Sequence, residues 1–432
     1  MNTPSIVVTA MGHFVPQTRL DNNFFSELDI AADSQWIADR TGIQTRYSVL
    51  DRTDIHLLRQ GTTDYIRLMH AGKVMSIAAM ANQTWAVMRE RLPRTGGPPR
   101  LDLLISGTSI PDWGAPANAC MIARELGVNC TAFDVNAACS SFVVGVHVLR
   151  SMLMSGSGRC GAVFTCERLS MCLNYAEYSN CVLLGDGAAG AVFEVAPSTP
   201  QGLELLDTII ASDPSGANLV TIPVGGMFAQ HGRAVQKFAI TKTVEITEAL
   251  LQRNGLTARD IRYFISHQAN LRMLTSVVSR LGLHPEQHLY NVDSHGNRGA
   301  AGAPMVMSMH WDRFAPGDLI VMAVVGAGLT WGAALFRCLY SAGGGKQISP
   351  GWMIRMDSTG VASPLSRILL DPDLQRMSSP VVRALFALSY LCKSSRYVWS
   401  SQTTPRRKWT SSHTSMAPSS SQCARTSTCF VR

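Results

Sequence analysis

Gly185-Asp186-Gly187-Ala188-Ala189-Gly190-Ala191-Val192-Phe193 and Gly326-Ala327-Gly328-Leu329-Thr330-Trp331-Gly332-Ala333-Ala334-Leu335-Phe336 are two similar glycine-rich stretches of this chain. Each predicts a strand, a Gly-x-Gly turn and a second strand of small residues. A pattern that recurs so far along a chain indicates an internal repeat. We therefore expect two related halves, residues 1–195 and 200–340, packed as one unit.

The segments before each glycine-rich stretch alternate between apolar, strand-like runs and helical patterns. The first half has predicted strands at 101–106 and 132–136 and predicted helices at 117–126 and 140–155. The second half repeats this order, with strands at 205–211, 261–266 and 319–325 and helices at 233–254 and 269–281. Strands that alternate with helices are typical of an α/β fold with a largely parallel sheet.

The first stretch also fits the GxGxxG pattern of dinucleotide-binding folds. That site requires a helix directly after the glycines, because the helix N-terminus binds the pyrophosphate. Residues 191–195 (AVFEV) are instead typical of a strand. We therefore expect no nicotinamide or flavin cofactor.

The composition is that of a globular enzyme rather than a membrane or metal-binding protein. The chain has 432 residues, 46% of them hydrophobic, which is enough for one large duplicated domain. No stretch is apolar for long enough to span a bilayer, and the N-terminus MNTPSIVVTAMGH lacks the pattern of a secretion signal, so we expect a cytoplasmic protein. The 11 cysteines are irregularly spaced and neither a paired CxxC set nor HExxH occurs, so we expect reduced thiols and no metal site.

The basic charge of the chain is concentrated in its last segment. Residues 341–432 hold 12 of the 38 Lys and Arg and 3 of the 30 Asp and Glu, which leaves 26 and 27 for residues 1–340. The body is thus close to neutral and gives no indication of a nucleic-acid-binding face. Ser, Thr, Arg and Pro dominate the last segment, so we expect a low-complexity, basic and disordered tail.

One cysteine stands where a nucleophile would be well placed. Cys139 lies in Asp134-Val135-Asn136-Ala137-Ala138-Cys139-Ser140-Ser141-Phe142, between a predicted strand and a predicted helix. The dipole of a helix favours a thiolate at its N-terminus, which lowers the pKa of the thiol. The alternative is a buried, inert thiol, and we assign that role to Cys120, Cys130, Cys160, Cys166, Cys172, Cys181 and Cys338.

A histidine and an asparagine stand at two further turns in the second half. His267 follows the predicted strand at 261–266, and Asn297 belongs to the sequence His295-Gly296-Asn297 in a glycine-rich segment. Glycine lets the backbone approach a ligand closely there. A histidine taken alone is more often structural than catalytic, so a catalytic role for His267 depends on the other motifs around it.

Together these motifs resemble the β-ketoacyl synthase III branch of the thiolase superfamily over about residues 1–340. The resemblance rests on ordered motifs, namely Trp36 with Arg40-Thr41-Gly42-Ile43, the Cys139 segment, Gly185-Asp186-Gly187, His267 to Arg272 (HQANLR), His295-Gly296-Asn297 and Thr330-Trp331-Gly332. It implies a thiolase-like, duplicated αβαβα layered fold and a homodimer in which Ser109–Ala119 of one copy lines the pocket of the other. It also implies that the enzyme needs no cofactor and takes acyl-coenzyme A and acyl carrier protein thioesters as substrates.

The resemblance implies a role for each of the three candidate residues. Cys139 would attack an acyl thioester, while the backbone amides of Cys139 and Ala327 stabilise the oxyanion. His267 and Asn297 would then polarise the thioester carbonyl of a malonyl substrate that loses carbon dioxide. The enolate attacks acyl-Cys139 and releases a β-ketoacyl thioester, and no metal is needed because decarboxylation supplies the carbanion.

Some positions implied to bind substrate depart from the family pattern. Trp36, with Arg40 nearby, matches a residue that stacks on the adenine of coenzyme A, but Tyr178 stands where its arginine partner is usual. Ala115 stands where a bulky aromatic often closes the acyl pocket. The smaller side chain predicts room for a primer longer than acetyl.

Three more departures lie beside the candidate catalytic residues. Val325 replaces an aromatic residue before the last glycine turn, and Ala327 replaces the middle glycine of that turn. Arg298 follows Asn297 where a small polar residue is usual. Arg298 either binds a carboxylate on the substrate or pairs with a nearby acidic side chain.

The positions implied to bind the carrier protein are Arg233, Lys237 and Arg272, for which the alternative is a solvated basic edge. The leading function is decarboxylative condensation. A second possibility keeps the acyl-Cys139 step but passes the acyl group to an oxygen or nitrogen nucleophile. A third is a weakly catalytic partner subunit of a heteromer, which intact Cys139 and His267 argue against.

Overall fold

The computed structural model describes residues 4–92, 100–196 and 201–340 of the chain. The tail predicted at 341–432 therefore lies outside the described residues. Strands from the first half are β1 (Ile6–Phe14), β4 (Leu103–Gly107), β5 (Thr131–Asp134), β6 (Cys160–Arg168) and β7 (Asp186–Val195). Strands from the second half are β8 (Gly202–Ser212), β11 (Tyr263–Ser266), β12 (Leu319–Gly326) and β13 (Thr330–Tyr340).

These strands form one nine-stranded sheet in the order β11-β12-β13-β8-β1-β7-β6-β4-β5. Reading outward from the central β1–β8 pair, each half places its strands in the same order: first, last, last but one and second. The third strand is β5 in the first half, and an isolated bridge between Phe264 and His288 takes its place in the second half. The predicted internal repeat is therefore present in the topology of the sheet.

The sheet is mixed, which corrects the expectation of a largely parallel one. β4 pairs in parallel with β5 and β6, and β11 pairs in parallel with β12. β7 and β13 run antiparallel to their neighbours. For β13 the reason is local, because only an antiparallel pair can be joined by so short a turn as that of Ala327–Leu329. The stretch from Gly185 also differs from its prediction, because it opens the single strand β7 and follows the short helix α8 (Tyr178–Cys181) rather than a strand.

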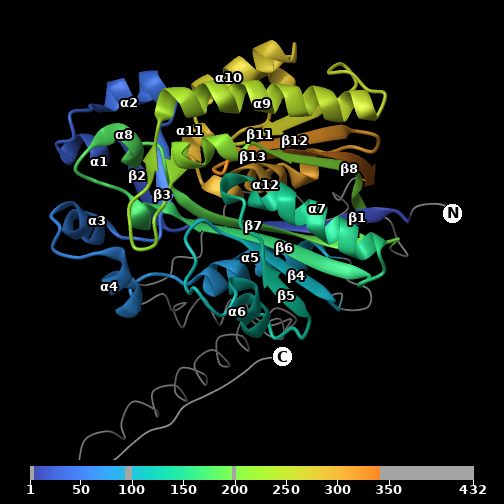
Figure 1. Cartoon of the computed structure of the whole chain (residues 1–432), viewed down its shortest axis with the longest axis horizontal. Coiled ribbons are helices and arrows are strands. Elements are labelled where there is room, and N and C mark those ends of the chain that lie inside the picture. Colours follow the sequence, from blue (N-terminus) through green and yellow to red (C-terminus); the bar gives the residue numbers. More distant parts are fainter. Residues whose placement is uncertain (1–3, 93–99, 197–200, 341–432) are drawn as a thin grey trace, which may run out of the picture. The chain divides into compact units, whose positions relative to one another are not determined.

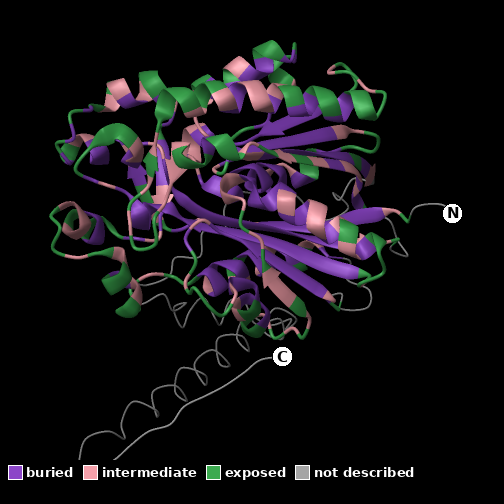
Figure 2. Cartoon of the chain, in the orientation of Figure 1, coloured by how far each residue is buried: buried purple, intermediate pink, exposed green. Residues whose placement is uncertain are grey.

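Helices cover the sheet in three layers, as Figure 1 shows. α7 (Ser141–Met154) and α12 (Gly302–Met309) lie in the middle and contact strands of both halves. α5 (Ile77–Arg91) and α6 (Asn118–Glu125) cover the outer face of the first half, while α9 (Gly232–Arg253) and α10 (Leu271–Arg280) cover that of the second. The layers therefore follow the order αβαβα, and the central strands are buried along most of their length (Figure 2).

A smaller lobe packs beside the first half. It contains β2 (Thr18–Asp21), β3 (Thr45–Ser48), α1 (Asn22–Glu27), α2 (Ser34–Thr41), α3 (Arg52–Arg59) and α4 (Tyr65–His70). An aspartate precedes each of these four helices and accepts a backbone N–H of the first turn, which satisfies a donor that the helix leaves unpaired: Asp21, Asp33, Asp51 and Asp64. The remaining short elements are β9 (Val220–Thr221), β10 (Ala229–Gln230) and α11 (Val292–His295).

None of the helices within the described ranges is long and apolar enough to cross a membrane.

Candidate active site

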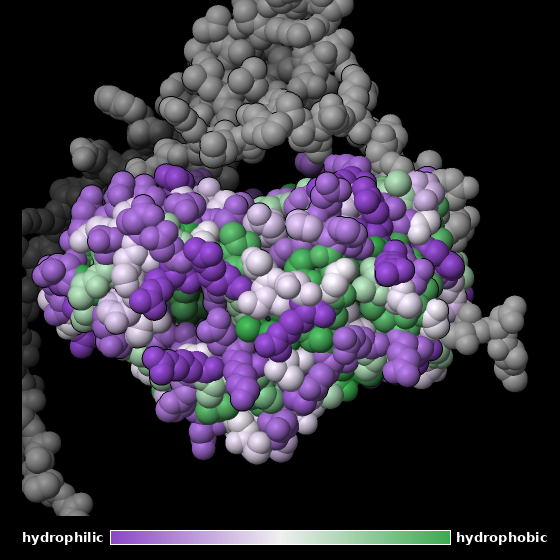
Figure 3. Space-filling view, turned by 90° about the horizontal axis from the view of Figure 1, so that it is seen from above, coloured by the Kyte–Doolittle hydropathy of each residue, from purple (hydrophilic) through white to green (hydrophobic). Residues whose placement is uncertain are grey.

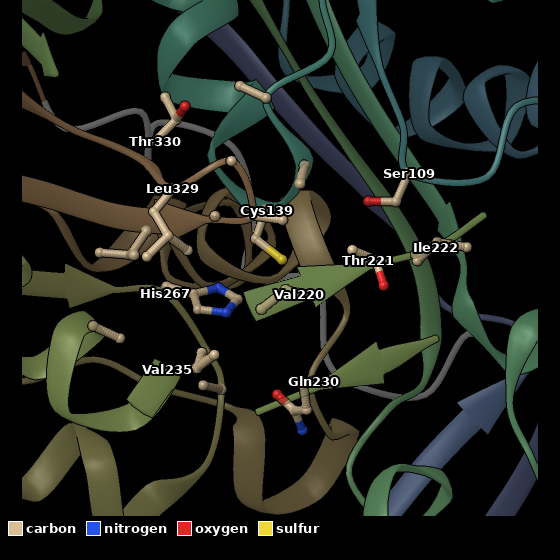
Figure 4. A pocket seen from close by; sticks show the side chains of 18 of the residues that line it. Ser109, Cys139, Val220, Thr221, Ile222, Gln230, Val235, His267, Leu329 and Thr330 are labelled. Carbon is tan, nitrogen blue, oxygen red and sulfur yellow. The ribbon is translucent and has the colours of Figure 1, made fainter. Parts of the chain in front are cut away.

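Turns from both halves meet at one cavity of about 440 Å³. Cys139 comes from the turn before α7, His267 from the loop after β11, and Asn297 from the turn after α11. In Figure 4 the Cys139 thiol and the His267 ring both point into this space. The structure thus brings together the three residues that the sequence singled out, although they are far apart along the chain.

The turn that carries Cys139 is held on both sides. Ser141 Oγ accepts a hydrogen bond from Ala137 N at 2.9 Å and donates one to Ala138 O at 2.7 Å. Ala138 has a positive φ of 47°, a conformation that costs free energy in a residue other than glycine. Ser140 Oγ donates to Thr330 O at 2.7 Å, which ties the turn to the second half. The backbone around the thiol is therefore fixed before any substrate binds.

The protonation state of Cys139 differs from the prediction. Burial, followed by the negative charge of Glu167, raises the pKa of the Cys139 thiol to about 12. This direction is opposite to the predicted lowering by the helix N-terminus, because withdrawal from water favours the neutral form of the thiol. The thiol is neutral in the free enzyme at neutral pH.

The glycine turn after β12 presses against the Cys139 turn. A Cβ at Gly326 would lie 2.5 Å from Ala137 O and 2.8 Å from Ser140 N, so only glycine fits this contact. The following residue, Ala327, lines the cavity together with Cys139. The two amides predicted to form the oxyanion hole thus belong to turns that touch, and Val325 contributes its apolar side chain to the same wall.

His267 is buried, with 7% of its surface exposed, and its backbone N–H donates to Ala323 O at 2.9 Å. Burial lowers the pKa of its imidazole to about 4. In the described part of the chain, Nδ1 of this ring has no hydrogen-bond partner. The ring is therefore neutral at physiological pH and able to donate one hydrogen bond into the cavity.

Asn297 and His267 are aligned by a residue that the sequence reasoning passed over. Gln268 is fully buried, and its Oε1 accepts hydrogen bonds from Asn291 N at 3.0 Å and Val292 N at 3.2 Å. It thereby joins the His267 loop to the helix that leads into Asn297. Asn297 Oδ1 accepts from Gly299 N at 3.0 Å, which orients its amide group so that Nδ2 can serve as a donor. Gln268 directly follows His267 in the HQANLR motif, and this position was the feature of the sequence that could have identified it.

The hairpin of β9 and β10 forms a wall of the cavity that the sequence did not predict. It contributes Val220, Thr221 and Gln230, and the loop between its strands adds Ile222 and Phe228 (Figure 4). Its strands have two residues each, too short to show alternating hydrophobicity.

The residues implied to hold coenzyme A lie outside the cavity wall. The ring of Trp36 contacts that of Tyr178 edge-on, with centroids 4.8 Å apart, and the Arg40 guanidinium lies 5.4 Å from the Trp36 ring. The three side chains form a cluster on α2 and α8. The two rings are in contact, so no gap separates Trp36 from Tyr178.

Arg298 does not occupy a substrate-binding position. Its side chain is fully buried away from the cavity, where Nη2 donates to Asn291 Oδ1 at 2.6 Å and Nη1 contacts the sulfur of Met305. Burial lowers the pKa of its guanidinium to about 9. Both sequence-based alternatives are therefore corrected: these donors reach an amide oxygen and a thioether, and neither a substrate carboxylate nor an acidic side chain.

The remaining predicted residues are exposed. Ala115 lies on the surface of the single chain, between β4 and α6. Arg233 and Lys237 are exposed on α9, and Arg272 is exposed on α10, where its Nε donates to Asp39 O at 3.0 Å. Figure 3 looks down on the face covered by α9 and α10 and shows mostly hydrophilic side chains around a hollow.

Comparison with known proteins agrees with this geometry. Residues 133–214 match the family model for 3-oxoacyl-[acyl-carrier-protein] synthase III, and residues 251–338 match the model for its C-terminal part. The β-ketoacyl-[acyl-carrier-protein] synthase III of Xanthomonas campestris pv. campestris is 31% identical over 345 residues, which cover 76% of this chain and 97% of that protein. The chain belongs to the β-ketoacyl-acyl-carrier-protein synthase III family.

Solved structures of synthase III enzymes confirm the thiolase-like fold. The 3-oxoacyl-[acyl-carrier-protein] synthase III of Aquifex aeolicus VF5 superposes with a TM-score of 0.67 at 27% identity and covers 77% of this chain and 99% of its own. The priming β-ketosynthase of the R1128 polyketide pathway superposes with a TM-score of 0.66 at 24% identity, which shows a common fold only; it covers 78% of this chain and 97% of its own. The protein is therefore a condensing enzyme of the synthase III type, and hence an acyltransferase.

Proposed function

We propose that this synthase carries an acyl group from acyl-coenzyme A on Cys139 and condenses it with malonyl acyl carrier protein, with loss of carbon dioxide. The observation that carries the proposal is the convergence of Cys139, His267 and Asn297 on one cavity. Family membership supplies the reaction class, since the named relatives are β-ketoacyl-acyl-carrier-protein synthases.

In the first half-reaction the thiol of Cys139 attacks the acyl thioester, and coenzyme A leaves with the proton. The amides of Cys139 and Ala327 stabilise the oxyanion, and such a donor typically contributes about 10²–10³ in rate. A thiol with a pKa of about 12 must lose its proton as the acyl donor binds. The departing coenzyme A thiolate takes up this proton, so the acylation step requires neither His267 nor Asn297.

In the second half-reaction His267 and Asn297 donate hydrogen bonds to the malonyl thioester oxygen. Both are neutral donors, so they stabilise the negative charge that develops when carbon dioxide leaves. The carbanion attacks the carbonyl carbon of acyl-Cys139, and the Cys139 sulfur departs with the bonding electrons. The presence of both donors favours condensation over transfer of the acyl group to an oxygen or nitrogen nucleophile.

The test separates the two half-reactions. Intact protein is offered a panel of acyl-coenzyme A thioesters, and mass spectrometry measures the adduct and maps it to a peptide. Cys139→Ala should form no adduct, whereas His267→Ala and Asn297→Ala should acylate and fail to decarboxylate malonyl carrier protein. Condensation by His267→Ala at the wild-type rate, or an adduct on another cysteine, would overturn the proposal.

A further inference from the structure

Glu167 is a fully buried carboxylate that the steps above do not use. Its Oε2 accepts a hydrogen bond from Ser109 N at 3.0 Å. Its Oε1 accepts from Ser109 Oγ at 3.0 Å and from Ala300 N at 3.2 Å. All three partners are donors, so the surroundings match an ionised carboxylate although burial raises the pKa of Glu167 to about 7.

The two residues that Glu167 binds belong to two separate segments of the site. Ser109 lines the cavity directly, and Ala300 belongs to the turn whose Gly299 N–H orients Asn297. Gly299 has a φ of 50°, and a Cβ there would lie 2.8 Å from Glu167 Oε1. Only glycine at position 299 leaves room for the Glu167 carboxylate. The carboxylate in turn holds the turn that positions Asn297.

The Cys139 turn packs against this same region. The short helical turn Ala138–Ser140 contacts the turn Gly299–Ala301, which in turn contacts β6, the strand that carries Glu167. The charge of Glu167 is the second cause, after burial, of the raised pKa of Cys139. The neighbouring cation on β6, Arg168, is paired with Asp112 at 2.6 Å and so does not neutralise Glu167.

We propose that Glu167 is a positioning residue that holds Ser109 and the Asn297 turn in place, with its negative charge beside the Cys139 turn. The inference rests on the proposed function for its catalytic meaning. Acylation converts the Cys139 thiol, which can ionise, into a neutral thioester. The repulsion between the Glu167 carboxylate and a Cys139 thiolate therefore ends once the acyl primer is attached. Glu167 then holds Asn297 while the malonyl group loses carbon dioxide, a step in which Cys139 carries no charge.

Apart from Arg298, whose pKa burial lowers to about 9, the titratable groups around this pair leave a pH window in which each variant is compared with the wild type at the same pH. Asp186 on β7 accepts hydrogen bonds from Ser170 and Val49, and burial raises its pKa to about 6. His267 across the cavity has a pKa of about 4, and burial raises the pKa of Cys166 far above its usual range. None of these groups changes charge between pH 8 and 10, where the alkylation rate of Cys139 follows its thiolate fraction.

The experiment measures alkylation of Cys139 by iodoacetamide between pH 8 and 10 in the whole protein, with mass spectrometry of the Cys139 peptide. Glu167→Gln keeps the shape and removes the charge, so its Cys139 should react faster, by about tenfold for each unit by which the thiol pKa falls. Glu167→Asp keeps the charge, so its Cys139 should react at about the wild-type rate. Exposed Cys120 serves as the reference for reagent in every sample.

Glu194→Gln is the matched control, because it removes a half-buried carboxylate on β7, the strand beside β6, where Glu194 Oε1 accepts a hydrogen bond from Thr9 Oγ1. It should leave the alkylation of Cys139 unchanged. Wild-type alkylation of Cys139 in Glu167→Gln, in protein that melts cooperatively, would overturn the electrostatic role.

The positioning role is read from decarboxylation of malonyl carrier protein. Both Glu167 variants should lower kcat with little change in KM, and Glu167→Asp should do so while its alkylation stays slow. Wild-type kcat in both variants would overturn the positioning role. Loss of all decarboxylation in the wild type would instead refute the proposed function, and the alkylation result would still stand.

Discussion

Individual ionisable residues whose pKa values are shifted by burial make the stability of this fold depend on pH. Burial is the first cause that lowers the pKa of His13, His267 and His288, each to about 4. An unfolded chain protonates these histidines below about pH 6.5, whereas the folded chain does not until about pH 4. Each histidine therefore costs stability as the pH falls, about 2 kcal/mol at pH 5. Glu167 and Asp186, with raised pKa values of about 7 and 6, act in the opposite direction.

We predict that His13→Asn makes the protein less sensitive to acid. His13 Nδ1 is hydrogen-bonded to Ser308 Oγ at 2.9 Å, a contact that an asparagine side chain can partly replace. The fall in Tm between pH 7.5 and pH 5, measured by circular dichroism, should be smaller than in the wild type. His70→Asn, which changes an exposed histidine on α4, should leave the fall as it is. An equal fall in His13→Asn would contradict the assigned pKa direction.

At the scale of elements, the contact between the β12 turn and the Cys139 turn joins the two halves at the site. We predict that Gly326→Ala lowers the acylation rate of Cys139 by about 10²-fold, because its Cβ would displace Ala137 O and Ser140 N and with them an oxyanion donor. Stopped-flow release of coenzyme A measures this step. Gly232→Ala, at the start of α9 with no atom within 4 Å of the new Cβ, is the control and should acylate normally. Unchanged acylation in Gly326→Ala would show that the turn has room to move.

Helices and strands with a clear periodic pattern of apolar residues were predictable from the sequence, and elements held by contacts with distant residues were not. The helix predicted at 233–254 is Gly232–Arg253, and the strand predicted at 319–325 is Leu319–Gly326, because long apolar patterns specify both. The β9–β10 hairpin has no such pattern, and backbone bonds such as Phe228 N to Cys172 O hold it in place. The antiparallel direction of β7 likewise depends on pairing with β1 and β6 rather than on its own residues.

The same distinction applies to the site. Cys139, His267 and Asn297 could be named from ordered motifs, since each lies at a turn beside a predicted element. The pKa direction of Cys139 and the inward position of Arg298 could not, because both follow from burial among residues remote in sequence. Glu167 gave no signal for the same reason, since its partners come from the loop after β4 and from the Asn297 turn.

On the scale of the whole molecule, the sheet ends on one side in an unpaired edge. Among the described strands, β5 pairs only with β4. An open edge tends to pair with another strand, and the nearby Trp113 leaves 53% of its surface exposed. We predict a homodimer that joins two β5 strands, detected as twice the monomer mass by light scattering at micromolar concentration. Ala132→Pro should shift the mass toward the monomer, since proline removes a strand donor. A monomeric wild type would contradict the prediction.

The length of the acyl primer follows from this assembly. Ala115 lies on an exposed loop of the single chain, so it reaches an acyl pocket only if a second copy supplies it. A methyl group in place of an aromatic ring leaves space for several methylenes, and each buried methylene contributes about 0.8 kcal/mol. We therefore predict that hexanoyl- and octanoyl-coenzyme A acylate Cys139 with a higher kcat/KM than acetyl-coenzyme A. Ala115→Phe should reverse this order, because the ring refills the space in the partner's pocket. The comparison needs only the adduct on Cys139, so it does not depend on the condensation step. A wild-type preference for acetyl that persists in Ala115→Phe would show that another side chain, such as Leu329 in the cavity wall, already closes the pocket.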